Sequence, residues 1–368
     1  MNRIKDVHQR LTDKRGQIAA SMETHQGLIA CIRRLPSEIL GEIFMHCLPP
    51  DAHNEPNPNT APLLLTRICR PWRKVALSTP RLWCSLSVRP SHRVQQQGLF
   101  YYHTWLSRAR GCPLSLAVDT RLVHAPRNPV WRYEVTELLQ PYTSRCSRLL
   151  VTFDEATAPE LLLKDIPVLE HLTLEGDMKY AQKIFITQPQ PHLRSLTLHS
   201  FPFSPDLLSL FNPAWANLTQ VKVVLGRGGD VDGHVFLSLL QLCPNLEGLV
   251  FNPICIGRSE VSVHPPGTLL HANLRSLDVI VLYGLNSLLN ILTLPKLRDL
   301  SISDLVLVPG PWPHKEFKSF LSRSHCPLAS LKIYGAQVSM KKEHRAEYVT
   351  LIPTLKHVGL GRGVVMNV

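Results

Sequence analysis

The chain has 368 residues, of which 44% are apolar and 18% are charged. This apolar fraction excludes a wholly disordered chain, because disordered chains lack the apolar surface whose burial offsets the entropy of ordering. The length is sufficient for one large body or for two to three ordinary domains. Thirty prolines against nineteen glycines predict many short elements, because proline interrupts both helices and strands.

The positive charge is concentrated in the first part of the chain. The formal net charge is +12, and residues 1–150 hold 21 Lys/Arg against 10 Asp/Glu, whereas residues 151–368 hold 19 against 18. Long-range attraction to phosphates can therefore start only from the N-terminal part. The nine cysteines are odd in number and form no C-x-x-C pair, a pattern typical of free thiols in a reducing compartment.

No segment predicts secretion or membrane insertion. The first residues, MNRIKDVHQRL, carry charges where a signal peptide needs an apolar stretch. The best membrane candidate, Val279–Pro295, is shorter than a typical span and contains polar residues, so a buried segment is the better interpretation. We therefore expect a protein of the cytoplasm, the nucleus or both, with no membrane partner.

Residues 1–34 predict an amphipathic helix. One seven-residue apolar register is nearly complete, at Ile4, Leu11, Ile18 and Ile32. The second register is interrupted by Lys14 and Ser21, and a long coiled coil needs both registers filled over several heptads. We expect a short amphipathic helix and leave open whether it has a coiled-coil partner.

Residues 35–81 predict a small domain of short helices. The segment LPSEILGEIFMHCL places its apolar residues on two adjacent rows of a helix of about three turns, with Ser37 available as the N-cap. The proline- and asparagine-rich stretch 49–62 then predicts a loop. The following segment, 62–80, predicts one or two short helices interrupted at Pro71, which would pack around Trp72.

After residue 81 the pattern changes to alternating strands and helices. LWCSLSV (82–88) and CPLSLAV (112–118) predict strands, and apolar residues between 99 and 109 and between 131 and 142 keep helical spacing. From residue 144 a degenerate L-x-x-L-x-L unit recurs eight times at intervals of 23 to 31 residues. Its first leucines are Leu169, Leu193, Leu218, Leu246, Leu274, Leu297, Leu328 and Leu355. Apolar helical stretches such as 205–211 and 234–243 separate the units.

This repeat resembles the leucine-rich repeat family. The asparagine that usually follows the strand is mostly missing, so the chain would be a degenerate variant backed by helices. The resemblance implies an α/β fold: a right-handed solenoid with a curved, mostly parallel sheet and outer helices. We expect the solenoid to span 82–368, with an irregular part over 82–143.

Residues 35–83 resemble an F-box followed by the extension common in fungal members. The matching text is LPSEILGEIF and then TRICRPWRKVALSTPRLW, and the Asp51–Pro62 loop departs from the family spacing. F-box proteins are substrate receptors of Skp–cullin–F-box ubiquitin ligases. The resemblance implies that a Skp-type adaptor contacts Leu35, Pro36, Ile39, Ile43, Phe44, Leu65, Ile68 and Trp72. The alternative is that these side chains merely form a helical core.

The substrate would lie on the inner face of the solenoid. In such an arc the residues between the buried leucines point to the concave side, because successive strand residues alternate faces. This face would carry nearly balanced charge and many hydroxyls, which favours a hydrogen-bonded protein segment over a highly phosphorylated one. The candidate residues are His171, Glu175, His199, Lys222, Asn252, Asp278, Asp299, Lys332 and Tyr334. The alternative is substrate binding at a loop edge or at the C-terminal end.

No motif predicts catalysis, a cofactor or a metal. The seventeen histidines form no H-E-x-x-H, and the glycine cluster 225–233 lacks the G-K-[ST] of a phosphate-binding loop. No G-x-S-x-G is present either. The expected function is therefore that of a non-enzymatic substrate receptor in a ubiquitin ligase. One alternative is a repeat scaffold or nucleic-acid binder that uses the basic N-terminal part, although the near-neutral repeats argue against nucleic acid. Another is an enzyme with an unrecognised site.

Overall fold

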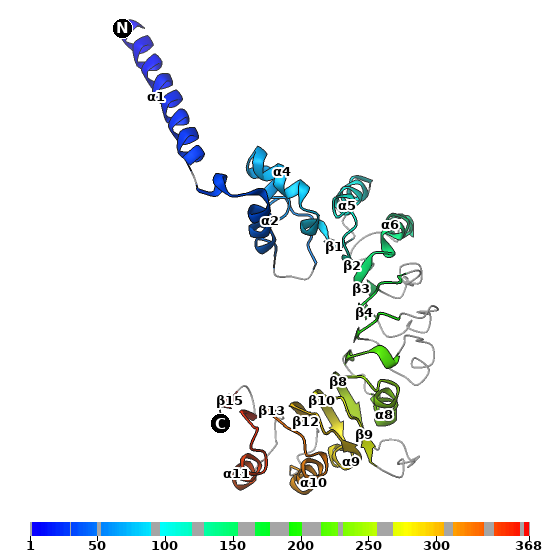
Figure 1. Ribbon diagram of the computed structural model, residues 1–368. Helices are drawn as coiled ribbons and strands as arrows, with labels where there is room; N and C mark the ends of the chain where they lie inside the picture. The colour runs from blue at the N-terminus through cyan, green and yellow to red at the C-terminus, as the bar shows by residue number, and fades with distance from the viewer. Residues whose placement is uncertain are drawn as a thin grey trace.

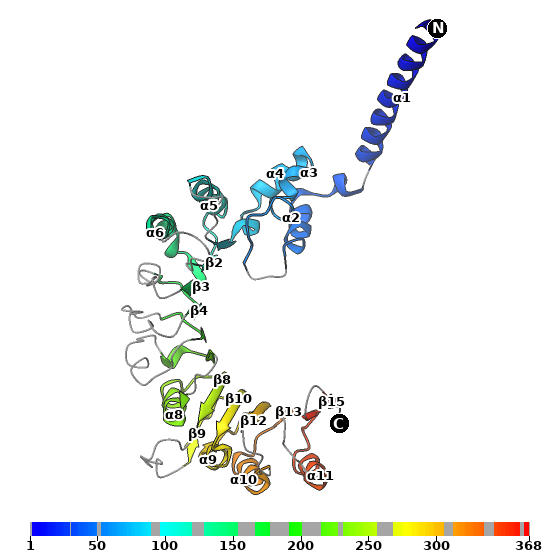
Figure 2. The same cartoon turned by 180° about the vertical axis from the view of Figure 1, so that it is seen from behind.

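An arc of parallel strands dominates the computed structural model, with strands on its inner side and helices on its outer side (Figure 1). The same cartoon seen from behind shows the helical N-terminal part at one end of the arc (Figure 2). The structure describes residues 2–29, 31–49, 53–89, 96–119, 129–153, 166–176, 191–200, 215–226, 231–255, 268–304, 312–334, 342–360 and 364–367.

A single 13-stranded sheet forms the inner layer. Twelve of these strands follow one another in chain order, and β7 lies off this path and pairs with β8. Each neighbouring pair is parallel except β14 with β15, which is antiparallel. The strands are β1 (Ser85–Val88), β2 (Leu114–Asp119), β3 (Cys146–Phe153), β4 (His171–Gly176), β5 (Ser195–His199), β6 (Gln220–Val224), β7 (Val231–Asp232), β8 (Gly248–Cys255), β10 (Ser276–Tyr283), β12 (Asp299–Asp304), β13 (Ser330–Tyr334), β14 (His357–Leu360) and β15 (Val364–Asn367). The short strands β9 (Leu269–Leu270) and β11 (Leu292–Thr293) pair separately.

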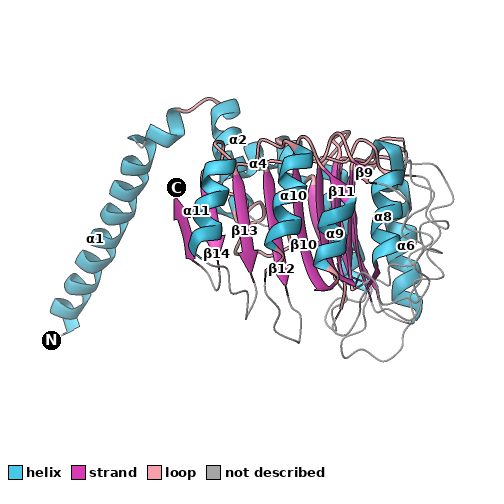
Figure 3. Ribbon diagram, turned by 90° about the horizontal axis from the view of Figure 1, so that it is seen from below, coloured by secondary structure: helices cyan, strands magenta, loops and turns pink. Residues whose placement is uncertain are grey.

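Among the described residues, the helices of the outer layer lie in the connections between successive strands, which run in parallel and so need crossover connections. Viewed from below, α8 to α11 lie side by side against the strands (Figure 3). The outer helices are α5 (Gln96–Arg108), α6 (Pro129–Thr143), α8 (Gly233–Leu242), α9 (Leu285–Ile291), α10 (His314–Ser324) and α11 (Lys342–Leu351), and the 3-10 turn η5 spans Trp215–Asn217. The predicted helical stretch 205–211 lies outside the described residues.

The repeat leucines form the core between the two layers. The eight first leucines of the L-x-x-L-x-L units are at most 6% exposed. The fourth positions align across neighbouring strands, so that Leu172 pairs with Leu196, and Leu277 lies between Leu249 and Leu300. Because each unit covers the apolar face of the next, the buried ladder continues along the arc. The predicted α/β solenoid-like architecture with a mostly parallel sheet is confirmed.

The sheet also extends through 82–143, where an irregular arrangement was expected. Leu86, Leu116 and Leu149 align across β1, β2 and β3 in the same ladder as the later units. The steps between these residues are 30 and 33 residues long, near and beyond the upper end of the 23 to 31 residues of the later units, and they contain the longer helices α5 and α6. The strand predicted over 82–88 begins only at Ser85, because residues 80–83 form the 3-10 helix η2 (Pro80–Trp83).

Asparagine side chains link three successive units to the units that precede them. The side-chain amides of Asn217, Asn245 and Asn273 each donate to a backbone carbonyl of the preceding unit, at 2.8 to 3.1 Å. Each asparagine directly precedes the first leucine of its unit. These three asparagines precede the strand, whereas the asparagine usual in leucine-rich repeats follows it.

Three short helices precede the sheet: α2 (Ser37–His46), α3 (Leu65–Ile68) and α4 (Arg70–Ser78). Extended backbone at Cys69 separates α3 from α4, and Pro71 lies in the first turn of α4, where its missing N–H costs no helical hydrogen bond. Ser37 does not cap α2 as predicted. The cap residue is Pro36, and the Ser37 hydroxyl donates to the Glu38 carboxylate instead.

Two tryptophans differ in their burial. Trp72 was expected at the centre of this helical segment, but it is only partly buried and packs on Phe44 with ring centroids 4.9 Å apart. Trp83 is fully buried, donates from Nε1 to the Ala76 carbonyl at 2.9 Å and contacts Trp105 of α5 edge to face. Trp83 therefore joins the helical segment to the solenoid.

The N-terminal helix α1 (Asn2–Ile29) projects away from the rest of the molecule and is followed by the 3-10 turn η1 (Cys31–Arg34) (Figure 1). Its described side chains are exposed, including Val7, Leu11, Ile18 and Met22. Within the described part of the chain, no helix combines the length and apolar character needed to cross a membrane.

Candidate binding surfaces

The eight predicted adaptor residues are divided between surface and core. Pro36, Ile39, Ile43 and Ile68 are exposed, whereas Phe44 and Leu65 are buried and Leu35 and Trp72 are half-buried. Leu64, which was not among the eight predicted residues, is a further apolar side chain at the surface of this segment and is 41% exposed. We call the surface members the exposed apolar set: Pro36, Ile39, Ile43, Leu64 and Ile68.

Helix α2 presents two apolar rows in different directions. Leu40 and Phe44 are four residues apart and face the core, where Leu40 is 5% and Phe44 0% exposed. Ile39 and Ile43 form the adjacent row and are 50% and 37% exposed. The buried row is held close to the rest of the segment at Gly41, where a Cβ atom would lie 3.2 Å from Thr79 Oγ1. A side chain at Gly41 would therefore require the Thr79 side chain to shift by a few tenths of an ångström.

Helix α3 repeats this division on a smaller scale. Leu65 is buried at 4% exposed, whereas Leu64 and Ile68, four residues apart, are 41% and 52% exposed. Four large aliphatic side chains in two helices are therefore accessible to solvent on this small helical segment. Exposed large aliphatic side chains on a folded segment are typical of a protein-binding site.

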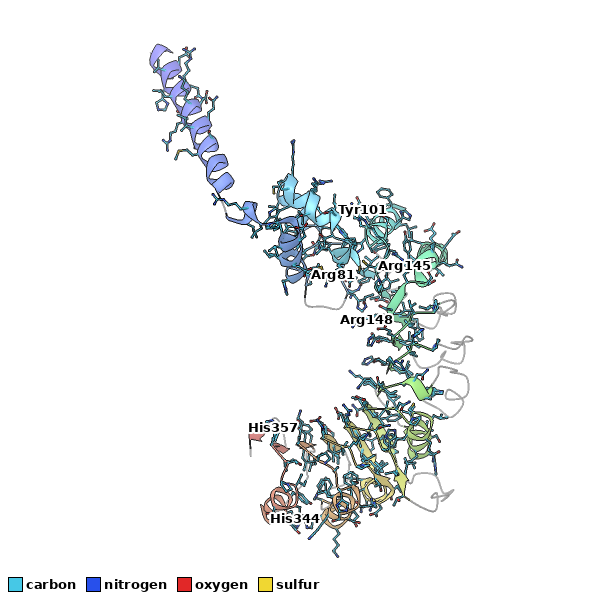
Figure 4. The ribbon with its side chains drawn as sticks, in the orientation of Figure 1. Arg81, Tyr101, Arg145, Arg148, His344 and His357 are labelled. Atoms are coloured by element: carbon cyan, nitrogen blue, oxygen red, sulfur yellow. The ribbon has the colours of Figure 1, made fainter. Side chains whose placement is uncertain are left out.

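The second surface is the strand face opposite the helices, which we call the concave face. Residues alternate between buried and accessible along β4, β5 and β6, so every second side chain points to the inner side of the arc. Arg148 of β3 and His357 of β14 lie on this side near the two ends, whereas His344 belongs to the outer helix α11 (Figure 4).

All nine predicted substrate residues lie on the concave face, and the register groups them in rows. The row that begins at Arg148 continues through His171 and Ser195 and later includes Asp299. Parallel rows contain the remaining candidates: Lys222, Asp278 and Lys332 in the second, and Glu175, His199, Asn252 and Tyr334 in the third. The alternation of strand residues therefore placed them correctly, although their binding role is not tested by their position.

Two histidines of this face remain neutral at neutral pH. Burial lowers the pKa of His171, and the positive charge of Arg148 lowers it further. Burial likewise lowers the pKa of His199, with Lys222 acting in the same direction. Both imidazoles can therefore accept as well as donate hydrogen bonds at pH 7.

Asn252 has a structural contact that sequence could not reveal. Its side-chain Oδ1 accepts a hydrogen bond from the Ile280 backbone N–H at 2.9 Å. The register between β8 and β10 shifts at this point, and the side chain replaces the missing strand-to-strand hydrogen bond. One acceptor site of Oδ1 and the amide nitrogen of Asn252 are left to contact a ligand.

A loop from the helical segment lies over the first strands of the concave face. The Ser87 N–H donates to the Asn54 carbonyl at 2.8 Å, and the Asn54 N–H donates to Ser85 Oγ at 3.3 Å. His53 Nε2 lies 3.2 Å from Ser115 Oγ, within hydrogen-bond distance. These contacts fix residues 53–55 against β1 and β2.

The loop and strands β1 to β4 enclose a polar cavity of about 560 Å³, which we call the junction cavity. Asn54 is only 3% exposed, and its Oδ1 has no hydrogen-bond partner among the described residues. Arg89 and Glu55 form an ion pair at the rim. The lining residues are Pro49, His53, Asn54, Glu55, Asn57, Thr60, Ser87, Arg89, Ala117, Asp119, Leu150, Thr152 and Glu175.

The sequence interpretation found only Glu175 of this cavity. The loop was recognised as a departure from the family spacing, but its contacts to Ser85, Ser87 and Ser115 join residues that are 31 or more positions apart. Alternation along CPLSLAV places Asp119 on the face opposite the buried Leu114 and Leu116. It does not indicate that a distant loop lies over this face.

The described residues contain no group of three or more His, Cys, Asp or Glu side chains that could hold a metal ion. Comparison of the chain with models of known protein families finds no match, and comparison with curated proteins finds none.

Proposed function

We propose that this protein is the substrate-receptor subunit of a Skp–cullin–F-box-type ubiquitin ligase. In this proposal residues 35–83 are a fungal-type F-box that binds a Skp-type adaptor, and the strands and helices from residue 82 onward are degenerate leucine-rich repeats that bind the substrate. The adaptor links the chain to a cullin. The ubiquitin-transfer chemistry occurs on other subunits, so this chain contributes proximity.

The observation that carries the proposal is the exposed apolar set on α2 and α3. Ile39 and Ile68 are each at least half exposed although they belong to short helices with buried neighbours. Aliphatic side chains exposed in this way gain free energy when a partner covers them. Four of its five members, all except Leu64, are positions at which the F-box resemblance expects adaptor contacts, while Phe44 and Leu65 support those positions from the core.

The substrate part of the proposal rests on the composition of the concave face. The polar rows of β3 to β13 present hydroxyls, neutral imidazoles and a few charges of both signs. Such a surface can form many directed hydrogen bonds to a protein segment, which provide specificity. Because adaptor and substrate use different surfaces, both can be bound at the same time.

Binding of the purified chain to a purified Skp-type adaptor tests the proposal. Replacing Ile39 and Ile68 together by alanine is expected to weaken this binding at least tenfold, or about 1.4 kcal/mol, because two accessible anchors are removed. The matched control replaces Phe100 and Leu270, which are 68% and 64% exposed on other elements, by alanine. Equal binding by the wild type and the Ile39/Ile68 variant, or no binding by the wild type, would refute the proposal.

A further inference from the structure

We propose that α1 binds an acidic amphipathic helix of a partner protein, side by side as in a two-stranded coiled coil. This interaction goes beyond the proposed ligase function, because it uses neither the exposed apolar set nor the concave face. Helix α1 projects from the helical segment and does not lie against the sheet or its outer helices (Figures 1 and 2). A second helix can therefore approach it along its length.

Helix α1 carries a narrow apolar stripe that is open to solvent. At 3.6 residues per turn, the members of this stripe fall within about 60° of one another around the helix axis. They are between 56% and 63% exposed and comprise Val7, Leu11, Ile18 and Met22. Helices in proteins are stabilised mainly by packing of such a face, and burial of large aliphatic side chains is favourable. The stripe therefore indicates a surface that a partner covers.

The charges beside the stripe are basic. Lys14 and Arg15 border it on its two sides, within about 60° of its centre, and Arg10 follows on the Lys14 side. The carboxylates of Asp6 and Asp13 lie on the far side of the helix, more than about 130° from the centre of the stripe. All five side chains are exposed. A partner that covers the stripe therefore meets cations first, and acidic groups complement them.

A second copy of the same helix fits this surface poorly. Lys14 occupies a seam position, seven residues after Val7, so in a parallel pair of identical helices it would face its own copy. Arg10 of one helix would then lie opposite Arg15 of the other. Reversal of one helix would still bring two basic borders together. Acidic borders would instead place carboxylates opposite these cations, and a lysine within the seam selects such a partner.

The stripe is also too narrow for a membrane surface. An apolar face that meets an extended surface is wider than about 100°, and helices that lie in the lipid interface commonly carry Trp or Phe on that face. Helix α1 contains no Phe, Trp or Tyr, and its stripe spans about 60°. A seam of this width is typical of a helix that packs against one other helix.

Fluorescence anisotropy of labelled synthetic helices, titrated with the full chain, tests this proposal. The acidic probe is a helix as long as α1 with leucine and isoleucine along its seam and glutamate at both borders. The matched basic probe has lysine at the same borders. We expect the acidic probe to bind at least tenfold more tightly than the basic probe, and its binding to weaken as salt is raised. Equal binding of the two probes, or no binding of the acidic probe, would overturn the proposal.

Two double variants locate the binding on the stripe. Leu11→Ala with Ile18→Ala removes two seam side chains and keeps the helix, because alanine is the best helix former. This variant should bind the acidic probe at least tenfold more weakly. The control, Gln9→Ala with Thr12→Ala, changes two exposed side chains outside the stripe and should bind as the wild type does. Equal loss in the two variants would contradict binding through the stripe.

A charge reversal and two further measurements separate the possible occupants. Lys14→Glu with Arg15→Glu should reverse the preference, so that the basic probe binds more tightly than the acidic one. Vesicles of phosphatidylcholine and phosphatidylserine test a membrane, and sedimentation of the full chain tests a second copy. Vesicle binding or self-association that Leu11→Ala with Ile18→Ala abolishes would overturn the proposal. Adaptor binding, measured separately, is expected to be unchanged in all these variants, so failure here leaves the ligase proposal intact.

Discussion

The helical segment and the repeat sheet differ in how completely their apolar side chains are buried. In the described strands, nearly every leucine, valine or isoleucine that points toward the helix layer is buried. The opposite, concave face of the sheet is mostly polar. In the helical segment, apolar residues occupy both a buried row and an exposed row of the same helix, as Phe44 and Ile43 show. One region therefore has a surface suited to a fixed apolar partner, and the other a surface suited to directed polar contacts.

The difference follows from how each region is built. Every repeat unit is covered by its neighbours, so an apolar face of period two is buried along the whole arc. The helical segment has only α2, α3, α4 and η2 to cover its apolar rows, and such a small body buries a limited fraction of its surface. The surplus row remains at the surface, where an adaptor can cover it.

The largest expected effect is at Trp83, where the two regions meet. Trp83→Ala would remove the contact with Trp105, the Nε1 hydrogen bond to Ala76 and the Arg108 guanidinium contact 4.5 Å above the ring. We expect the free energy of unfolding to fall by about 3–5 kcal/mol, as for other buried tryptophans. Urea denaturation followed by circular dichroism measures this, with Phe100→Ala as the exposed control. A loss below about 1 kcal/mol would mean that the two regions do not share a core.

The next largest effect separates the two rows of α2. Phe44→Ala is expected to lower the free energy of unfolding by about 3 kcal/mol, because the ring is fully buried, whereas Ile43→Ala should cost under about 1 kcal/mol. Ile43→Ala should nevertheless weaken adaptor binding. Parallel denaturation and binding measurements on both variants check the contrast. If Ile43→Ala destabilises the chain as much as Phe44→Ala, the exposed row belongs to the core and the comparison is wrong.

Much of this architecture follows from sequence periodicity, because the leucines that define each unit are also the ones buried between the layers. The spacing from Leu169 to Leu355 predicted the strand order, and alternation placed Lys222 and Asp299 on the concave face. Periodicity fails where packing partners are distant in sequence. It could not show that Gly41 packs close to Thr79, or that Asn54 bonds across 31 residues to Ser85.

A smaller effect is expected in the asparagine ladder of the sheet. Asn245→Ala removes the hydrogen bond to the Ala216 carbonyl and should lower the free energy of unfolding by about 1 kcal/mol, as for a typical single hydrogen bond. Asn286→Ala in α9 is the control, because this side chain is exposed on a helix. Thermal denaturation of both variants measures the difference. Equal melting temperatures would show that the ladder does not stabilise the junction between units.

The smallest effects are pKa shifts on the concave face. Arg148→Met is expected to raise the pKa of His171 and of His53, and Lys222→Met that of His199, because each change removes a positive charge that opposes protonation. Lys332→Met, on the same face beside β12, is the control. Proton NMR titration of the imidazoles gives the values. A fall or no change in the pKa of His171 in Arg148→Met would contradict the assigned cause.

The same shifts set the direction of the pH dependence. The pKa values of His53, His171 and His199 are lower in the folded chain than in the unfolded chain. Between the folded and unfolded pKa values, the folded chain therefore binds fewer protons than the unfolded chain. Their contribution to stability is complete above about pH 6.5 and is lost as the pH falls through the folded values. Denaturation midpoints should therefore decrease between pH 7 and pH 5. A rise in the midpoint would show that other groups dominate this range.

Hydrogen exchange of the full chain with and without a purified Skp-type adaptor tests the central claim most directly. The two-surface account predicts slower backbone exchange in α2 and α3 when the adaptor is bound, and unchanged exchange in β4 to β13 of the concave face. Protection confined to the concave strands, or no protection anywhere, would contradict the assignment of the exposed apolar set to the adaptor.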